Sequence, residues 1–216
     1  MGYFNSINLI NFRNFENYSI SFSKNCNVFF GKNGSGKTNI LEAISLFSKG
    51  RGLRKDKFSN IIKRNSEKFI IKSDFKSEDI IYNLIAESEN INNRFKKKLT
   101  VNNDKSSDSL QLIYDKTPFL NFLPETERLF QSSPSVRRSL IDQFIYSSKN
   151  KYNKLINRYN KLIQERTKIL MSNNNEESWL NQLEKKISLD ALQIYFLREN
   201  QIKVLINNLN TYLKEF

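Results

Sequence analysis

The segment VFFGKNGSGKTN, residues 28–39, restricts the possible folds more than any other part of the chain. Its spacing matches G-x-x-x-x-G-K-[ST], the pattern of a phosphate-binding loop, or P-loop. Such a loop binds phosphate where backbone N–H groups converge at the N-terminus of a helix, and it needs a strand before it and a helix after it. The sequence therefore predicts an α/β fold with strand, loop and helix in that order.

Both flanks of the loop have the expected patterns. CNVFF, at 26–30, is apolar apart from Asn27, which predicts a buried strand. Apolar residues then recur at helical spacing from Ile40 to Phe47, and Gly50 is placed to end that helix. The loop therefore has the context that distinguishes a P-loop from an ordinary tight turn.

The remaining chain divides into a strand-rich part and a helical part. Alternation or short apolar runs predict strands at 3–12, 18–22, 68–75, 79–87, 97–101 and 110–114. Ser133 and Pro134 predict the start of a helix that runs to about Ser147. Apolar stripes over 151–171 and 179–213 predict an antiparallel helical hairpin. We expect two domains, a nucleotide-binding lobe over 1–123 and a helical lobe over 124–216.

Each residue type in the loop suits a nucleotide phosphate group. Glycine allows the tight backbone path that a Cβ atom would obstruct. Lys37 would place its charge on the β- and γ-phosphates, and the Thr38 hydroxyl would coordinate Mg²⁺. The predicted cofactor-binding residues are Gly31, Lys32, Asn33, Gly34, Ser35, Gly36, Lys37 and Thr38.

The charge of the chain suggests a phosphate-rich partner without proving one. Lys and Arg exceed Asp and Glu by 35 to 22, a formal net charge of +13. However, Lys, Asn and Ile are abundant throughout, as low-GC coding alone would produce, and a run of charges is commonly just a solvated face. Two clusters are candidate DNA contacts: Arg51, Arg54, Lys55 and Lys57, and Arg94, Lys96, Lys97 and Lys98.

Composition also removes several classes of site. The chain has no His, which excludes His-based acid–base catalysis and His metal ligands. Its single cysteine, Cys26, excludes an internal disulfide framework and favours a reducing, cytoplasmic setting. No apolar run reaches the roughly 18 residues expected of a membrane span, so we expect no membrane partner.

Several stretches resemble the RecF family of SMC-like ABC ATPases. LINFRNF at 9–15, the P-loop itself and LEAISLFSKGRGLR at 41–54 are similar to that family's opening elements. The most specific match is PETERLFQSSPSVRRSLID, where the agreeing positions are Pro124, Glu125, Leu129, Ser133, Pro134, Arg137, Arg138 and Asp142. Two positions differ, because Ser132 stands where glycine is expected and Leu140 where an aromatic residue is usual. The helices from Tyr152 onward also resemble the family's second lobe.

The resemblance implies a partial ABC-type ATPase head with a helical second lobe, and ATP with Mg²⁺ as its cofactors. It implies that Arg13 approaches the nucleotide and that Arg137 and Arg138 make interlobe or phosphate contacts. It further implies a cytoplasmic protein of the DNA-damage and SOS response, active in repair and replication restart, that positions recombination factors at gaps. The implied partners are single-stranded or gapped duplex DNA, a RecR-like mediator and, for the full-length protein, a second copy in an ATP-dependent homodimer.

Two elements of an ABC-type site are missing from the sequence. Such a site also needs a glycine-containing signature loop and an apolar strand that ends in acidic residues. No glycine follows Gly52, and the runs SLID at 139–142 and LIAE at 84–87 lie in the wrong elements. We therefore expect the N-terminal portion of a longer protein, which binds ATP without hydrolysing it. A P-loop kinase of a small acceptor, or a non-catalytic fragment that dimerises through its helices, are the alternatives.

Overall fold

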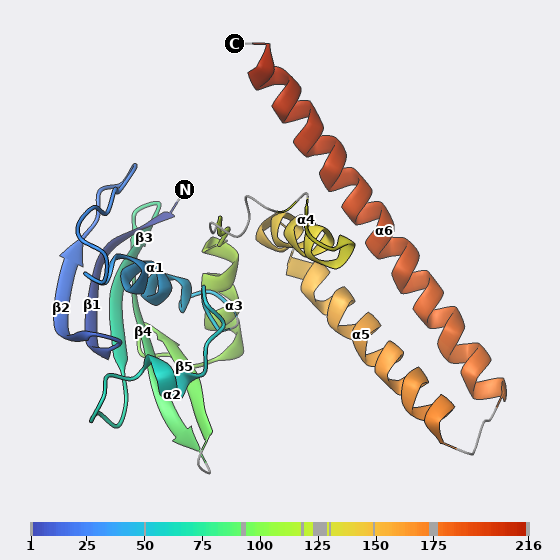
Figure 1. The fold of residues 1–216 in the computed structure, drawn as a ribbon, viewed down its shortest axis with the longest axis horizontal. Helices are drawn as coiled ribbons and strands as arrows, with labels where there is room; N and C mark the ends of the chain where they lie inside the picture. Colours follow the sequence, from blue (N-terminus) through green and yellow to red (C-terminus); the bar gives the residue numbers. More distant parts are fainter. Residues whose placement is uncertain are drawn as a thin grey trace. The chain divides into compact units, whose positions relative to one another are not determined.

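The computed structural model describes residues 2–49, 51–91, 94–117, 119–122, 129, 131–148, 150–172 and 177–214. The chain forms two compact units, Met1–Phe119 and Leu120–Phe216 (Figure 1). The predicted boundary between 123 and 124 lies outside the described residues. Within the described ranges, no helix is both long and apolar enough to cross a membrane.

The first unit is built on a five-stranded sheet in the order β2-β1-β3-β4-β5. Every neighbouring pair is antiparallel. Side chains alternate across the sheet, so that Ile7 and Leu9 enter the core while Ser6 and Asn8 face away from it. The strands are β1 (Gly2–Phe12), β2 (Phe15–Ser21), β3 (Ile70–Ser77), β4 (Ile80–Ile91) and β5 (Arg94–Val101).

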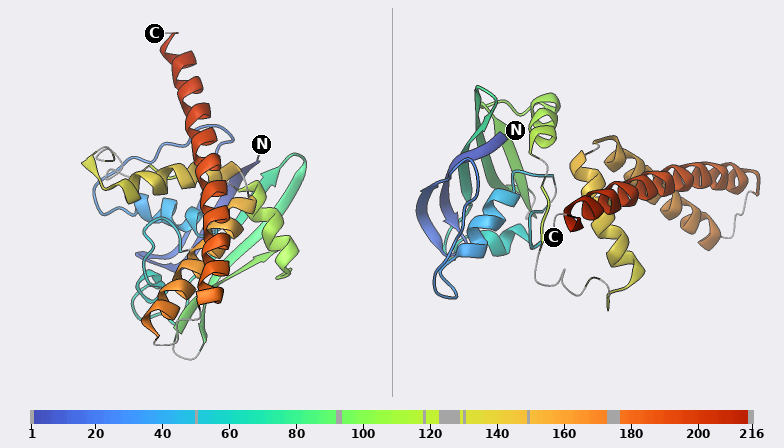
Figure 2. Two further views of the ribbon diagram at one scale, coloured as in Figure 1. Left: turned by 90° about the vertical axis from the view of Figure 1, so that its right-hand side faces the viewer. Right: turned by 90° about the horizontal axis from the view of Figure 1, so that it is seen from above.

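Three helices close the core on one side of this sheet, as Figure 2 shows. They are α1 (Lys37–Ser45), α2 (Phe58–Ile61) and α3 (Ser107–Lys116). Ile40, Ile61 and Ile113 bring one apolar residue from each helix into a single buried cluster with the inward-facing strand residues. Burial of this apolar surface fixes α1, and with it the end of the P-loop, against the sheet.

The predicted strand at 26–30 does not form. The segment has no strand partner among the described residues, and the side chains of Val28 and Phe30 are 77% and 92% exposed. Its turn is held locally, since the Asn27 side chain bonds the backbone N–H and C=O of Ser23 at 2.8 and 3.0 Å. An apolar run becomes a strand only where another strand satisfies its backbone groups, and none of β1 to β5 runs beside this one.

The predicted strand at 110–114 is also wrong, because these residues belong to α3. The Ser106 hydroxyl caps that helix by accepting from the Ser109 N–H at 3.3 Å. Leu110, Ile113 and Tyr114 then face the core at spacings of three and four residues. A short apolar run is compatible with either period, and here the cap and the packing decide for helix.

The second unit is helical throughout its described secondary structure, with α4 (Pro134–Ser148), α5 (Asn150–Met171) and α6 (Glu177–Leu213). Arg158 bonds Asp190, with Nε to Oδ2 at 2.7 Å, and Arg166 bonds Glu184 at 2.7 Å. The residue number rises along α5 from the first pair to the second while it falls along α6, so the two helices are antiparallel. This confirms the predicted hairpin and the helix that begins at Pro134.

Candidate nucleotide-binding site

The P-loop leads into α1 through left-handed glycines. Gly34 and Gly36 have φ angles of 82° and 97°, which other residues rarely adopt. A Cβ atom on Gly36 would lie 2.5 Å from Cζ of Phe15, so contact as well as conformation excludes a side chain there. By contrast, a Cβ atom on Gly34 would meet open space, which leaves that side of the loop accessible to a ligand.

Lys37 folds back over the loop. Its Nζ donates to the carbonyl oxygens of Gly31 and Lys32 at 2.8 and 2.9 Å. The backbone N–H groups of Lys37 and Thr38 open α1 and have no acceptor one turn earlier, as at any helix start. The loop and the first turn of α1 therefore supply an ammonium group, N–H groups without a helical acceptor and an exposed threonine. This donor set fits a polyphosphate and an associated Mg²⁺ ion.

The turn between β1 and β2 clamps the start of α1. Asn39 Nδ2 donates to Asn14 Oδ1 at 2.8 Å, across 25 positions of sequence. The ring of Phe15 stacks on Tyr18 with centroids 4.7 Å apart and lies against Gly36. The loop is thus joined to the sheet by a side-chain hydrogen bond and by an aromatic contact.

One helical turn further on, Arg13 is held by acidic side chains. Its guanidinium donates to both carboxylate oxygens of Glu42 at 2.9 and 2.7 Å, to Asp56 at 3.0 Å and to the Asn60 carbonyl at 2.9 Å. Glu42 is fully buried. The hydrogen bond that Arg13 donates to Glu42, opposed in part by burial, raises the pKa of Arg13. The structure thus directs the Arg13 guanidinium to α1. The approach of Arg13 to the nucleotide, which the resemblance implies, stays a prediction.

Arg54, from the basic cluster at 51–57, is the second arginine that contacts Glu42. It donates to Asn39 Oδ1 at 3.0 Å and to Glu42 Oε2 at 3.3 Å. Glu42 therefore accepts from two arginines that lie 29 positions before it and 12 positions after it in sequence. Sequence reasoning missed Glu42, and the available signal was a single charged residue inside the mostly apolar series from Ile40 to Phe47.

Two further candidates from the sequence, Asp142 and Arg137, make hydrogen bonds within the helical unit. In α4, Asp142 accepts from the Tyr152 hydroxyl at 2.6 Å and from Arg198 at 2.8 and 2.9 Å, which ties α4 to α5 and α6. Arg137 donates to the Ser132 carbonyl at 3.1 Å, and the side chain of Arg138 is exposed. SLID is therefore part of a helix, as predicted, and its aspartate has three donors.

The cluster at 94–98 is divided between two roles. Lys97 Nζ donates to the carbonyls of Leu46 and Ser48 at 2.8 and 2.7 Å, just beyond the C-terminus of α1, and burial lowers its pKa to about 8. Lys96 and Lys98 lie opposite Glu89 and Glu87 in the β4–β5 register. Acidic neighbours thus offset this cluster, whereas Arg51, Lys55 and Lys57 have exposed side chains.

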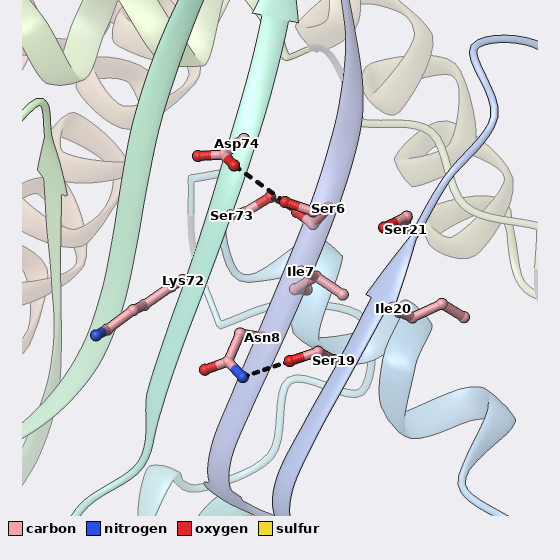
Figure 3. A pocket seen from close by; sticks show the side chains of 9 residues that line it. All are labelled: Ser6, Ile7, Asn8, Ser19, Ile20, Ser21, Lys72, Ser73 and Asp74. Atoms are coloured by element: carbon pink, nitrogen blue, oxygen red, sulfur yellow. Dashed lines mark hydrogen bonds between the residues drawn. The ribbon is translucent and has the colours of Figure 1, made fainter.

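A polar hollow of about 420 Å³ opens on the sheet face that points away from the helices (Figure 3). Its side chains bond one another, because Ser6 Oγ donates to Asp74 at 3.1 Å and Asn8 Nδ2 donates to Ser19 Oγ at 2.7 Å. The P-loop leads into α1 on the opposite, helix-covered face. The hollow is therefore separate from the candidate nucleotide site.

Comparison with known proteins agrees with this geometry. The AAA domain family matches residues 6–216. The DNA replication and repair protein RecF of Rickettsia conorii is 33% identical over 186 residues, which cover 86% of this chain and 51% of that protein. RecF of Rickettsia massiliae gives the same identity and coverage. Two solved structures of the recombination mediator protein RecF in the RecFOR pathway, RecF-ATP and RecF-ATPrS, match the whole chain, with TM-scores of 0.83 and 0.81. Each is 28% identical to this chain, which covers 58% of that structure.

The chain belongs to the AAA domain family. Its predicted resemblance to RecF is confirmed, and its fold is that of the RecF ATPase head with a helical lobe that contains a long hairpin. It spans about half the length of the curated relatives that it matches, at 51% of each.

Proposed function

We propose that this chain binds ATP with Mg²⁺ at the P-loop. The observation that carries the proposal is the position of Lys37, whose ammonium group lies over a loop of left-handed glycines at the start of α1. A triphosphate would replace the two carbonyl contacts of Lys37 with stronger, charge-assisted ones. The neighbouring RecF-ATP structure supports ATP as the nucleotide.

In this proposal the residues have distinct roles. The backbone from Gly31 to Gly36 surrounds the phosphate groups, including the N–H groups of Lys32, Asn33, Gly34 and Ser35. Lys37 binds the terminal phosphates and Thr38 coordinates Mg²⁺. Arg13 remains part of the site, but it acts by holding α1 through Glu42.

ATP titration of the purified chain tests this site. Lys37→Ala should weaken ATP binding by at least about tenfold, since it removes a charge-assisted contact worth roughly 1.5–3 kcal/mol. Lys24→Ala is the matched control, because Lys24 precedes the loop and is exposed. Equal ATP affinity in wild type and Lys37→Ala would refute the assignment.

We further propose that this chain binds ATP without turning it over. Hydrolysis needs an oriented water and stabilisation of transition-state charge, and losing one such contribution can cost on the order of 10³-fold or more. Asp142, one acidic residue that ends an apolar run, is already engaged by Tyr152 and Arg198. Phosphate release with Mg-ATP should match that of Lys37→Ala, with or without DNA. DNA-stimulated release that the mutation abolishes would contradict this proposal.

We propose a RecF-like role in recombinational repair and replication restart, in which the complete protein binds single-stranded or gapped duplex DNA. It would position recombination factors there with a RecR-like mediator and form an ATP-dependent homodimer in the cytoplasm during the SOS response. The RecF relatives and the RecFOR pathway of the neighbouring structures support this role. DNA binding would be electrostatic and largely independent of base sequence.

Of the two basic clusters, the one at 51–57 is the better candidate for DNA contact. Reversing Arg51, Lys55 and Lys57 to Glu should reduce the slope of log affinity against log salt by roughly 2 to 3. Reversing Arg94, Lys96 and Lys98 changes the net charge equally and should have the smaller effect, because Glu87 and Glu89 lie opposite two of these lysines. The reverse order of effects would move the DNA contact to β5.

A further inference from the structure

The outer face of α6 carries an apolar patch that the hairpin does not use. Leu189, Leu192, Tyr195 and Phe196, here called the α6 patch, are 67%, 55%, 61% and 56% exposed. Spacings of three, four and seven residues place them on one side of the helix over two turns. Large apolar side chains gathered on an exposed face are typical of an interaction surface.

The hairpin packs through a different side of the same helix. Leu183, Asp190 and Ile194 are buried, and Asp190 is bonded to Arg158 of α5. At 100° per residue, Leu192 points about 160° away from Ile194, so the α6 patch lies roughly opposite the packed side. Folding of the hairpin therefore leaves the α6 patch without a partner among the described residues.

The charges beside the α6 patch indicate what covers it. Lys185 lies seven residues before Leu192, and Glu199 lies seven residues after it, with both near the patch side of the helix. Glu199 is also ion-paired through Oε1 with Lys203 of its own helix at 2.9 Å, so its Oε2 is the atom that would accept from a second copy. In a two-fold antiparallel contact centred on Leu192, Lys185 of one chain would meet Glu199 of the other twice. A parallel contact would instead oppose like charges at both places.

We propose that the α6 patch binds the α6 patch of a second copy of this chain, antiparallel and centred on Leu192. A two-fold contact needs one self-complementary surface, and the pairing of Lys185 with Glu199 at both ends of the contact provides it. Four side chains from each copy make an interface at the small end of the known range, so the association is weak. It goes beyond the proposed nucleotide function, because no P-loop residue takes part in it.

Sedimentation equilibrium at increasing concentrations of the whole chain tests this proposal. Leu192→Glu should raise the dissociation constant on the order of 30-fold or more, as expected for a residue at an interface centre. Leu209→Glu is the matched control, because Leu209 lies on the same helix, is 59% exposed and is outside the α6 patch. A wild-type chain that stays monomeric, or equal effects of both variants, would overturn the proposal. The measurement is made without ATP, so that the ATP-dependent homodimer proposed above does not contribute to the association.

Cross-linking tests the orientation. In a Cys26→Ser background, Leu192→Cys should form an intermolecular disulfide, because the two-fold axis brings residue 192 close to its own copy. Asn200→Cys should not, since an antiparallel contact places it beside residue 184. Lys185→Glu and Glu199→Lys should each weaken the dimer, and the double variant should restore it. Disulfides at both positions would indicate a parallel pair and would contradict the proposal.

Discussion

Replacing Glu42 by Gln should destabilise the first unit although it removes no side-chain volume. The Glu42 carboxylate is fully buried and accepts from Arg13 at 2.9 and 2.7 Å and from Arg54 at 3.3 Å. Gln removes the negative charge and leaves one oxygen to accept. Breaking a buried ion pair by removing one partner typically costs about 3–5 kcal/mol. Because Arg13 keeps Asp56 and Arg54 is partly exposed, we expect about 2–3 kcal/mol.

Glu16→Gln is the matched control for this prediction. Glu16 accepts from Lys63 at 2.8 Å, nearly the same distance, but its side chain is largely exposed. Water screens an exposed pair and salt weakens it further, so this variant should be almost neutral. The comparison separates the effect of burial from the effect of hydrogen-bond length.

Hydrogen exchange of the β1 and α1 amides in increasing urea is the suitable assay. The single tryptophan, Trp179, lies in α6 and reports on the other unit. Glu42→Gln should also weaken ATP binding, since α1 carries Lys37 and Thr38. Equal destabilisation by Glu42→Gln and Glu16→Gln would refute the argument that this cluster anchors the P-loop helix.

Three further predictions follow from single contacts. Burial lowers the pKa of Lys97 to about 8 in the folded chain, so between pH about 8 and 10.5 the unfolded chain keeps a proton that the folded chain has lost. The free energy of unfolding, measured by urea titration relative to Lys97→Met, should therefore rise with pH over this range by up to about 3 kcal/mol. Gly36→Ala should lower the free energy of unfolding by more than about 1 kcal/mol in the same titrations, because Gly36 has a positive φ and a Cβ atom there would meet the Phe15 ring. The same variant should weaken ATP binding. Asp142→Asn should destabilise the second unit by about 2–3 kcal/mol, followed by Trp179 fluorescence.

Local patterns in the sequence predicted the P-loop, the helix after it and the long helical hairpin. Each of these features depends on residues within a few positions of one another. The spacing from Gly31 to Thr38 specifies a loop at a helix start, and the apolar stripes over 151–171 and 179–213 specify two amphipathic helices. The structure therefore contains these three features where the sequence predicted them, because the spacing of nearby residues is enough to specify a helix or a glycine loop.

Tertiary structure alone decided the partners of the strands and charges. The run at 26–30 has the composition of a strand, yet pairing depends on which strand lies beside it. In the sequence, Arg13 was a candidate nucleotide contact and Lys97 a candidate DNA contact. In the structure, Glu42 accepts from Arg13 across 29 positions, and carbonyls just beyond α1 accept from Lys97 across 49 and 51 positions. A buried charge must be paired where the fold places it, and the identity of that partner is fixed by the folded backbone and not by the neighbouring sequence.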